Sequence, residues 1–124
     1  MHIADRRKHA RVETSNLISH ESIDKDGQIV SHSMGKALNV SRSGILLETA
    51  RFIEAEHVSI ATIDLDNNLI KITGRLIYCR ETVTGMYQVG ISFIGSEHET
   101  AKFTVKLIKL YHHRKHNMIV QIAA

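Results

Sequence analysis

The fold is decided by the turn Asp24-Lys25-Asp26-Gly27 and by the runs on either side of it, Val12 to Ser19 and Gln28 to Val40. Both runs are rich in the β-branched and apolar residues that favour strands. Gly27 can adopt the positive φ that a tight hairpin turn requires, so Asp26-Gly27 is a strong hairpin signal. This stretch therefore predicts antiparallel strands joined by a short turn.

The same succession of strands and turns continues along the chain. Further strands are expected at Ile45 to Thr49, His57 to Leu65, Leu69 to Arg80 and Tyr87 to Ile94. The turns between them are expected at residues 41–44, 66–68 and 82–85. Roughly six strands with short connections and no intervening helix predict an all-β fold, an antiparallel barrel or sandwich. Gly74 and Gly90 each lie inside a strand, where barrel closure often needs a bend or a close backbone approach.

The two ends of the chain differ from this central part. Residues 1–11 show no strand or helix period, and we expect them to form an N-terminal arm before a β-barrel at 12–95. Ser96-Glu97-His98-Glu99 matches a capping box and predicts a C-terminal helix over 96–116. The remaining residues, 117–124, form an apolar tail that either docks on the domain or meets another chain.

Length, charge and cysteine content narrow the class of protein. The chain of 124 residues is long enough for one domain with its own core, and its formal charge of +3 suits anionic ligands. The lone cysteine, Cys79, cannot form an internal disulfide and lies in an apolar run typical of a buried position. No apolar stretch approaches the roughly 20 residues that span a bilayer, and the start lacks a secretion signal. We therefore expect a cytoplasmic protein.

Two polar clusters predict a binding site for a small anion. Arg7 and Arg11 form the spacing R-x-x-x-R, and each guanidinium can grip phosphate oxygens or the O6/N7 edge of a guanine. Asn39, Ser41 and Gly44 form N-x-S-x-x-G, which supplies an amide, a hydroxyl and a glycine turn. Neither cluster is specific alone, because basic N-termini and Asn-x-Ser turns are common. Their combination in this order carries the prediction.

Together these clusters resemble the signature of the PilZ domain, the bacterial receptor module for cyclic di-GMP. The resemblance covers nearly the whole chain, and residues 87–93 are similar to the family's glycine in an apolar strand. It implies a six-stranded antiparallel barrel whose N-terminal arm wraps the ligand on the outer surface, with no catalysis and no other cofactor. It also implies a signalling role in which arm ordering changes the surface offered to a protein target of motility, export or polysaccharide machinery.

The resemblance implies roles for individual residues as well. Arg7 and Arg11 would contact phosphate and guanine, Asn39 a guanine edge, and Ser41 a phosphate or guanine group. Gly44 would allow a close approach or a sharp turn. Further contacts are expected from residues beside the motifs: Arg6, Arg42 and Ser43. In the family an arginine at the place of Arg6 often accompanies an intercalated pair of ligands, and the alternative is that Arg6 is a solvated charge.

This sequence departs from the family pattern at two places. Ala10 stands where many relatives have proline, which bears on the rigidity of the arm. The chain has no tryptophan, so Tyr78 is expected to take an aromatic place in the core. Neither departure touches a position expected to contact the ligand.

Other interpretations stay open at this point. His112, His113 and His116 suggest a metal, but a solvated basic helix end explains them better because no cysteine or carboxylate joins them at ligand spacing. Asp64 and Asp66 flank a turn, where aspartate is favoured for its backbone hydrogen bonds, so an enzyme is not supported. The main alternatives are a single-stranded nucleic-acid binder and a PilZ-like interaction module without a ligand. A homodimer through the tail is also compatible with the sequence.

Overall fold

The computed structural model describes residues 10–123. It contains six strands and one helix: β1 (Val12–Ile23), β2 (Ile29–Val40), β3 (Gly44–Thr49), β4 (His57–Ile63), β5 (Leu69–Glu81), β6 (Tyr87–Ile94) and α1 (Glu97–Ala123). The strands follow the expected segments closely, and β1 is longer than the run that ends at Ser19. No helix in the described part of the chain is both long and apolar enough to cross a membrane.

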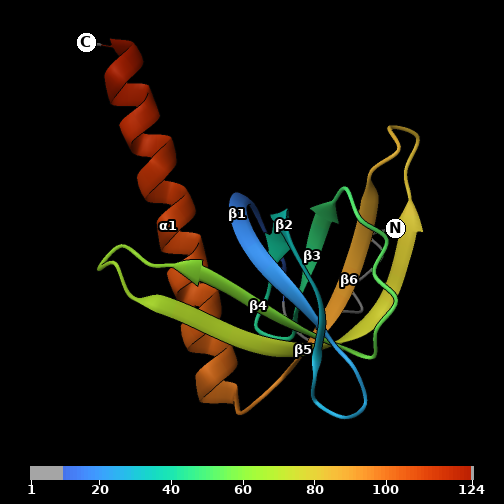
Figure 1. Cartoon of the computed structure of the whole chain (residues 1–124). Helices are drawn as coiled ribbons and strands as arrows, with labels where there is room; N and C mark the ends of the chain where they lie inside the picture. Colours follow the sequence, from blue (N-terminus) through green and yellow to red (C-terminus); the bar gives the residue numbers. More distant parts are fainter. Residues whose placement is uncertain (1–9, 124) are drawn as a thin grey trace, which may run out of the picture.

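The six strands form a closed antiparallel barrel in the order β1-β2-β3-β6-β5-β4 (Figure 1). Closure comes from β1, which pairs with β2 along its length and with β4 through its second half. The expected six-stranded antiparallel barrel is confirmed. Every strand therefore has a partner on both sides, and its side chains alternate between the interior and the outer surface.

Three hairpin turns share one geometry, which explains why the chain needs no proline to make them. In the β1–β2 turn, the Asp24 carboxylate accepts hydrogen bonds from the backbone N–H groups of Asp26 and Gln28, both at 2.9 Å. Asp64 repeats this arrangement between β4 and β5. The fourth position of each turn has positive φ, at Gly27 (80°), Asn67 (66°) and Gly85 (83°). Glycine and asparagine tolerate this conformation best, so the turn residues determine where the strands reverse.

The core fills the barrel and continues onto one face of α1. Among its fully buried side chains are Ile18, Ile45, Leu47, Ile60 and Val89. Phe103 and Leu107 of α1 complete this core, and the ring of Phe103 meets that of Phe93 edge-on at a centroid distance of 5.7 Å. Cys79 packs against the same core while remaining partly exposed.

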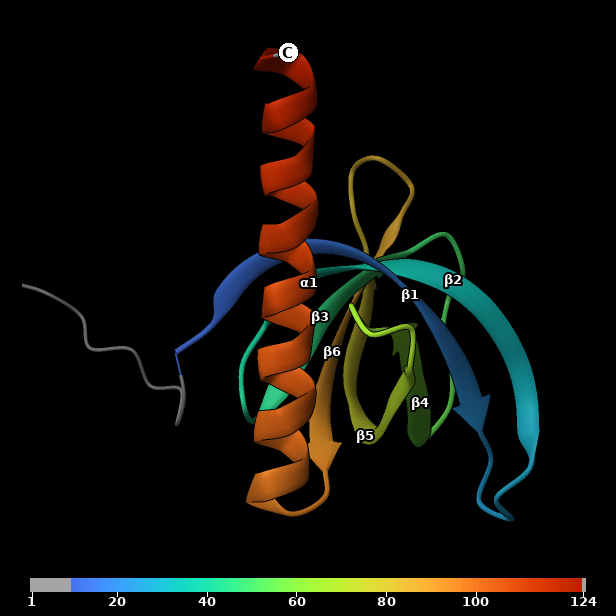
Figure 2. The same ribbon diagram turned by 90° about the vertical axis from the view of Figure 1, so that its left-hand side faces the viewer.

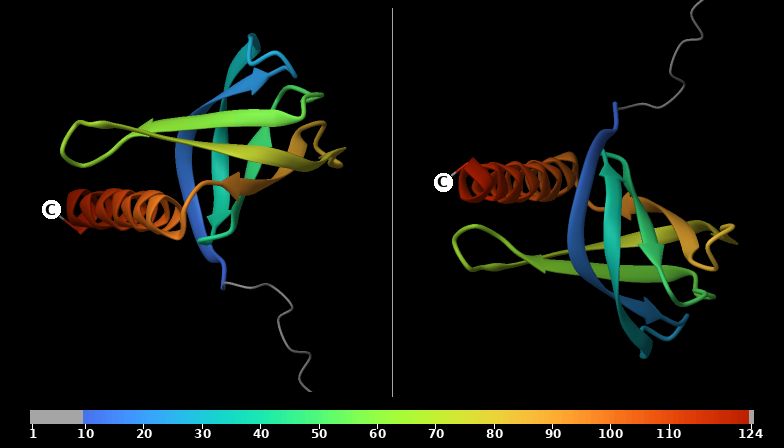
Figure 3. Two further views of the ribbon diagram at one scale, coloured as in Figure 1. Left: turned by 90° about the horizontal axis from the view of Figure 1, so that it is seen from below. Right: turned by 90° about the horizontal axis from the view of Figure 1, so that it is seen from above.

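Helix α1 lies outside the ring of strands and against β1 and β5 (Figures 2 and 3). Ser96 caps it as expected, because its hydroxyl accepts a hydrogen bond from the Glu99 N–H at 3.1 Å. Among residues 97–117 of α1, the last buried position is Leu110, and the helix then extends past the barrel. The helix continues to Ala123, so residues 117–123 extend it where a separate tail was expected.

Several polar side chains are buried among the apolar residues of the barrel. His20 on β1 is 2% exposed, and its Nε2 lies 3.0 Å from Thr49 Oγ1. Burial lowers the pKa of His20 below its ordinary value of 6.5, and the positive charge of nearby His32 lowers it further. The folded protein therefore favours the neutral imidazole.

This burial predicts a pH dependence of stability. Because the unfolded chain binds a proton at His20 at a higher pH than the folded protein, stability is full above pH 6.5 and declines as the pH falls from there toward the lowered pKa. The slope from one proton is at most about 1.4 kcal/mol per pH unit. Urea denaturation of wild type and His20→Gln between pH 7.5 and 5 measures it, with exposed His98→Gln as the control. Equal slopes for wild type and His20→Gln would contradict the prediction.

Candidate functional site

The two sequence motifs meet at the start of β1 and the end of β2. Arg11 directly precedes β1, and Asn39 is the next-to-last residue of β2, which runs antiparallel to β1. The guanidinium Nη1 of Arg11 donates a hydrogen bond to Asn39 Oδ1 at 2.8 Å. The structure thus brings together one residue from each predicted cluster across 28 positions of sequence. Arg6 and Arg7 lie outside the described residues.

The loop between β2 and β3 is held together by the Ser41 side chain. Ser41 Oγ accepts hydrogen bonds from the backbone N–H groups of Ser43 at 3.2 Å and Gly44 at 3.3 Å. Ser41 is 2% exposed, whereas Arg42 is exposed and Ser43 is partly exposed. In this structure the Ser41 hydroxyl therefore shapes the loop from inside, and the groups that face outward belong to its neighbours.

Gly44 is required by close packing of β3 against β6. A Cβ atom at this position would collide with the carbonyl oxygen of Ile91 on the neighbouring strand. The close approach that the structure shows is between β3 and β6, and a role of Gly44 toward a ligand stays a prediction. Gly44 therefore lets β3 begin in close contact with β6.

A hollow of about 380 Å³ opens beside Arg11. Its lining comes from the residue before β1, the β2–β3 loop, β3, β5 and β6: Arg11, Ser43, Gly44, Ile77, Tyr78, Gly90, Ile91 and Ser92. Tyr78 is 41% exposed, and its ring covers the bare backbone of Gly90. The guanidinium of Arg80 lies 5.4 Å from the centre of this ring. The site thus combines arginine donors with an exposed aromatic surface.

The expected place of Tyr78 in the core is wrong, and the reason is a β-bulge. Alternate residues of β5 face the interior as far as Leu76, and strict alternation would place Tyr78 inside as well. The register against β6 shifts between Leu76 and Tyr78, because Ile77 is an extra residue. One extra residue reverses the alternation, so Tyr78 faces outward and Cys79 packs inward.

A second bulge turns Asn39 toward Arg11. Gly35 and Ala37 of β2 are buried, so strict alternation would bury Asn39 too. The register against β3 shifts between Ala37 and Asn39, which leaves Leu38 as the extra residue and Val40 as the next buried one. Two irregularities that no residue pattern marks therefore place Tyr78 in the hollow and Asn39 against Arg11, which lines it.

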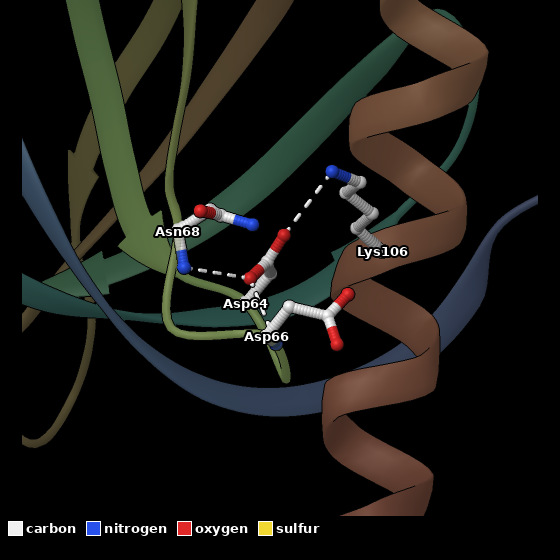
Figure 4. A network of polar contacts seen from close by, with 4 residues as sticks. All are labelled: Asp64, Asp66, Asn68 and Lys106. Carbon is white, nitrogen blue, oxygen red and sulfur yellow. Dashed lines mark hydrogen bonds and ion pairs between the residues drawn. The ribbon is translucent and has the colours of Figure 1, made fainter.

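The remaining sequence candidates lie away from this hollow. Asp64 and Asp66 sit in the β4–β5 turn, where Asp64 Oδ1 accepts backbone hydrogen bonds and Oδ2 pairs with Lys106 at 3.1 Å (Figure 4). The pKa of the Asp64 carboxyl lies below its ordinary 3.8, mainly because the Asn68 N–H donates to it and also because of Lys106. The backbone hydrogen bonds are those expected of an aspartate in a turn, and the pair with Lys106 in addition ties the turn to α1.

The histidines of α1 do not gather into a cluster. His112, His113 and His116 are exposed on the part of α1 that extends past the barrel. Within residues 10–123, no group of three or more histidine, cysteine, aspartate or glutamate side chains is placed to hold a metal ion.

Comparisons with known proteins agree on one family. The family model described as "PilZ domain" matches residues 5–109, a range that includes both clusters. No curated protein matches the sequence. Among solved structures, the PilZ domain of YcgR from Escherichia coli with c-di-GMP is 13% identical, with a TM-score of 0.60, over 92% of this chain and 98% of that chain.

Two other solved structures share the fold. The MrkH–c-di-GMP complex from K. pneumonia is 17% identical with a TM-score of 0.58, over 91% of this chain and 57% of that one. This chain thus spans little more than half of MrkH. The PilZ domain of CeSA from a cellulose-synthesizing bacterium is 16% identical with a TM-score of 0.55, over 86% of this chain and 98% of that one.

The close packing of β3 on β6 at Gly44 predicts that a larger residue there destabilises the protein. Gly44→Ala should destabilise the protein by about 1–3 kcal/mol, because the new methyl group forces β3 away from the Ile91 carbonyl. Thermal and urea denaturation measure the loss, with Ser43→Ala as the neighbouring control. An alanine variant as stable as wild type would contradict the prediction, because it would show that β3 and β6 can move apart without loss of stability.

Proposed function

The chain belongs to the PilZ domain family, and from this membership we propose that it is a receptor for cyclic di-GMP that binds the dinucleotide at the hollow beside Arg11. The observation that carries the proposal is the Arg11–Asn39 hydrogen bond, which joins the two halves of the family signature at one place on the barrel. Two structures of similar fold, those of YcgR and MrkH, were solved with this ligand.

The donor groups suit a ligand with two phosphates and two guanines. A guanidinium carries five N–H donors in a rigid fork, and Asn39 uses one of those of Arg11. The remaining donors stay available for a phosphate or for the O6/N7 edge of guanine. We therefore assign Asn39 two roles, holding the guanidinium in place and offering its amide nitrogen to the ligand. Arg7 would supply the second fork from the arm.

Tyr78 adds a surface for base stacking that sequence reasoning did not assign to the site. Its exposed ring forms part of the hollow, and Arg80 already approaches this ring. A guanine stacked on a tyrosine gains about 1–3 kcal/mol in other nucleotide-binding proteins. Ser43 and Arg42 would border the ligand, whereas Ser41 would act mainly by holding their loop in shape.

The receptor role implies a signal rather than a reaction. Closure of the N-terminal arm over the ligand costs about 1–2 kcal/mol of conformational entropy per ordered residue, which the charged contacts must exceed. The ordered arm then changes the surface available to a protein target. A motility, export or polysaccharide component would be such a target.

Calorimetric titration with cyclic di-GMP tests the proposal. Arg11→Ala should weaken binding by about 10- to 100-fold, because charged hydrogen bonds are lost. Asn39→Ala should weaken it by about three- to tenfold, and Arg51→Ala, at the opposite end of β3, should leave it unchanged. Binding that is insensitive to Arg11→Ala would refute the site.

Binding of a single-stranded oligonucleotide with a steep salt dependence, and none of the dinucleotide, would refute the function.

The same titration addresses Arg6. If Arg6 holds an intercalated ligand pair, wild type should bind two molecules of cyclic di-GMP per chain and Arg6→Ala one. A ratio that Arg6→Ala leaves unchanged would show that Arg6 is a solvated charge. Lys8→Ala, a neighbouring charge outside the motif, is the control.

A further inference from the structure

Helix α1 is hydrogen-bonded directly to the loop that carries the second motif. Thr104 lies on the inner face of α1 and is 4% exposed. Its hydroxyl donates to the backbone carbonyl oxygen of Ser41 at 2.8 Å, across 63 positions of sequence. Ser41 in turn holds the N–H groups of Ser43 and Gly44. The chain of contacts thus runs from the helix to the edge of the hollow in two steps.

The Thr104 hydroxyl has two acceptors and a single proton. The carbonyl oxygens of Ser41 and of Thr100, one turn earlier in α1, both lie 2.8 Å from Thr104 Oγ1. A hydroxyl rotates freely and donates fully to only one acceptor at a time. The loop and the helix therefore compete for the same proton.

A second contact connects α1 to the strand that follows Arg11. Asn16 of β1 is fully buried, and its Nδ2 donates to the backbone carbonyl of Leu107 at 2.8 Å. Its Oδ1 is buried without a hydrogen-bond partner, which is costly in an apolar interior. Within one turn of the helix, Thr104 is therefore held to the loop of the second motif and Leu107 to β1, the strand that follows the first motif.

We propose that Thr104 is a positioning residue for the ligand site and that it couples the β2–β3 loop to α1. Only the second part of this proposal, the coupling, rests on the proposed function. The first part does not, because Thr104 positions the loop in the absence of ligand. By thermodynamic linkage, a ligand that favours one position of the loop changes the stability of α1 by the same free energy that α1 contributes to binding. The helix, whose residues 112–117 are exposed, is then the element that displays the bound state.

Amide hydrogen exchange of the free protein, followed by NMR, tests the positioning step. Thr104→Val keeps the shape of the side chain and removes its donor, so exchange at Ser41, Ser43 and Gly44 should accelerate by about two- to tenfold. Thr100→Val is the matched control, because Thr100 is equally buried and its hydroxyl donates within α1, to Glu97. Thr104→Ser restores the hydroxyl and should restore slow exchange. Equal exchange in Thr104→Val and Thr100→Val would overturn the proposal.

The same variants with cyclic di-GMP test the coupling. Saturating ligand should change amide exchange along α1 in wild type and in Thr100→Val, and this change should be lost in Thr104→Val. Thr104→Val should also bind the ligand two- to tenfold more weakly, about the effect of one hydrogen bond. An unchanged α1 response in Thr104→Val would refute the coupling. If wild type fails to bind the ligand, the proposed function is wrong, and the exchange of the free protein still decides the role of Thr104. Thr104→Ala serves as a second variant if the valine unfolds the protein.

Discussion

Closure of the barrel through β1 is the constraint on which the rest of the structure depends. Because β1 pairs with both β2 and β4, no strand can slide without breaking a ladder, and the alternation of inward and outward side chains is determined around the whole ring. Only an extra residue in a strand can change that alternation locally. The bulge at Ile77 does so at the hollow, and the bulge at Leu38 does so beside Arg11, which lines the hollow.

The proposed ligand site therefore depends on local irregularities in the barrel. Each bulge turns outward a residue that the strand would otherwise bury, and Asn39 and Tyr78 are the residues so exposed. Gly44 and Gly90 supply the complementary feature, because their bare backbones let Ile91 and the Tyr78 ring approach closely. Bulges beside functional sites have this use in many sheets, where they direct a side chain that regular pairing would hide.

The interior shows how the barrel and α1 depend on each other. Apolar residues of the strands and of α1 share one core, so the helix covers surface that the barrel alone would leave open to water. Within this core, Asn16, His20 and Thr104 are buried polar groups, and each makes a hydrogen bond to a distant part of the chain. A buried polar group costs free energy unless it is paired. The bonds of Asn16 and Thr104 hold α1 in one position on the barrel, and the bond of His20 joins β1 to β3.

The amino-acid sequence alone determined the turns of the barrel and the start of α1, and it marked the family. The turn Asp24-Lys25-Asp26-Gly27 and its counterparts determine where the strands reverse, and Ser96 determines where the helix starts, because turns and caps depend on neighbouring residues. The spacing of the motif residues Arg7, Arg11, Asn39 and Ser41 marks the family. Only the tertiary structure decided that Asn39 meets Arg11, that Tyr78 faces the solvent, and that Thr104 holds Ser41. These outcomes depend on the register between strands and on contacts between residues far apart in sequence, and a bulge of one residue reverses what periodicity predicts.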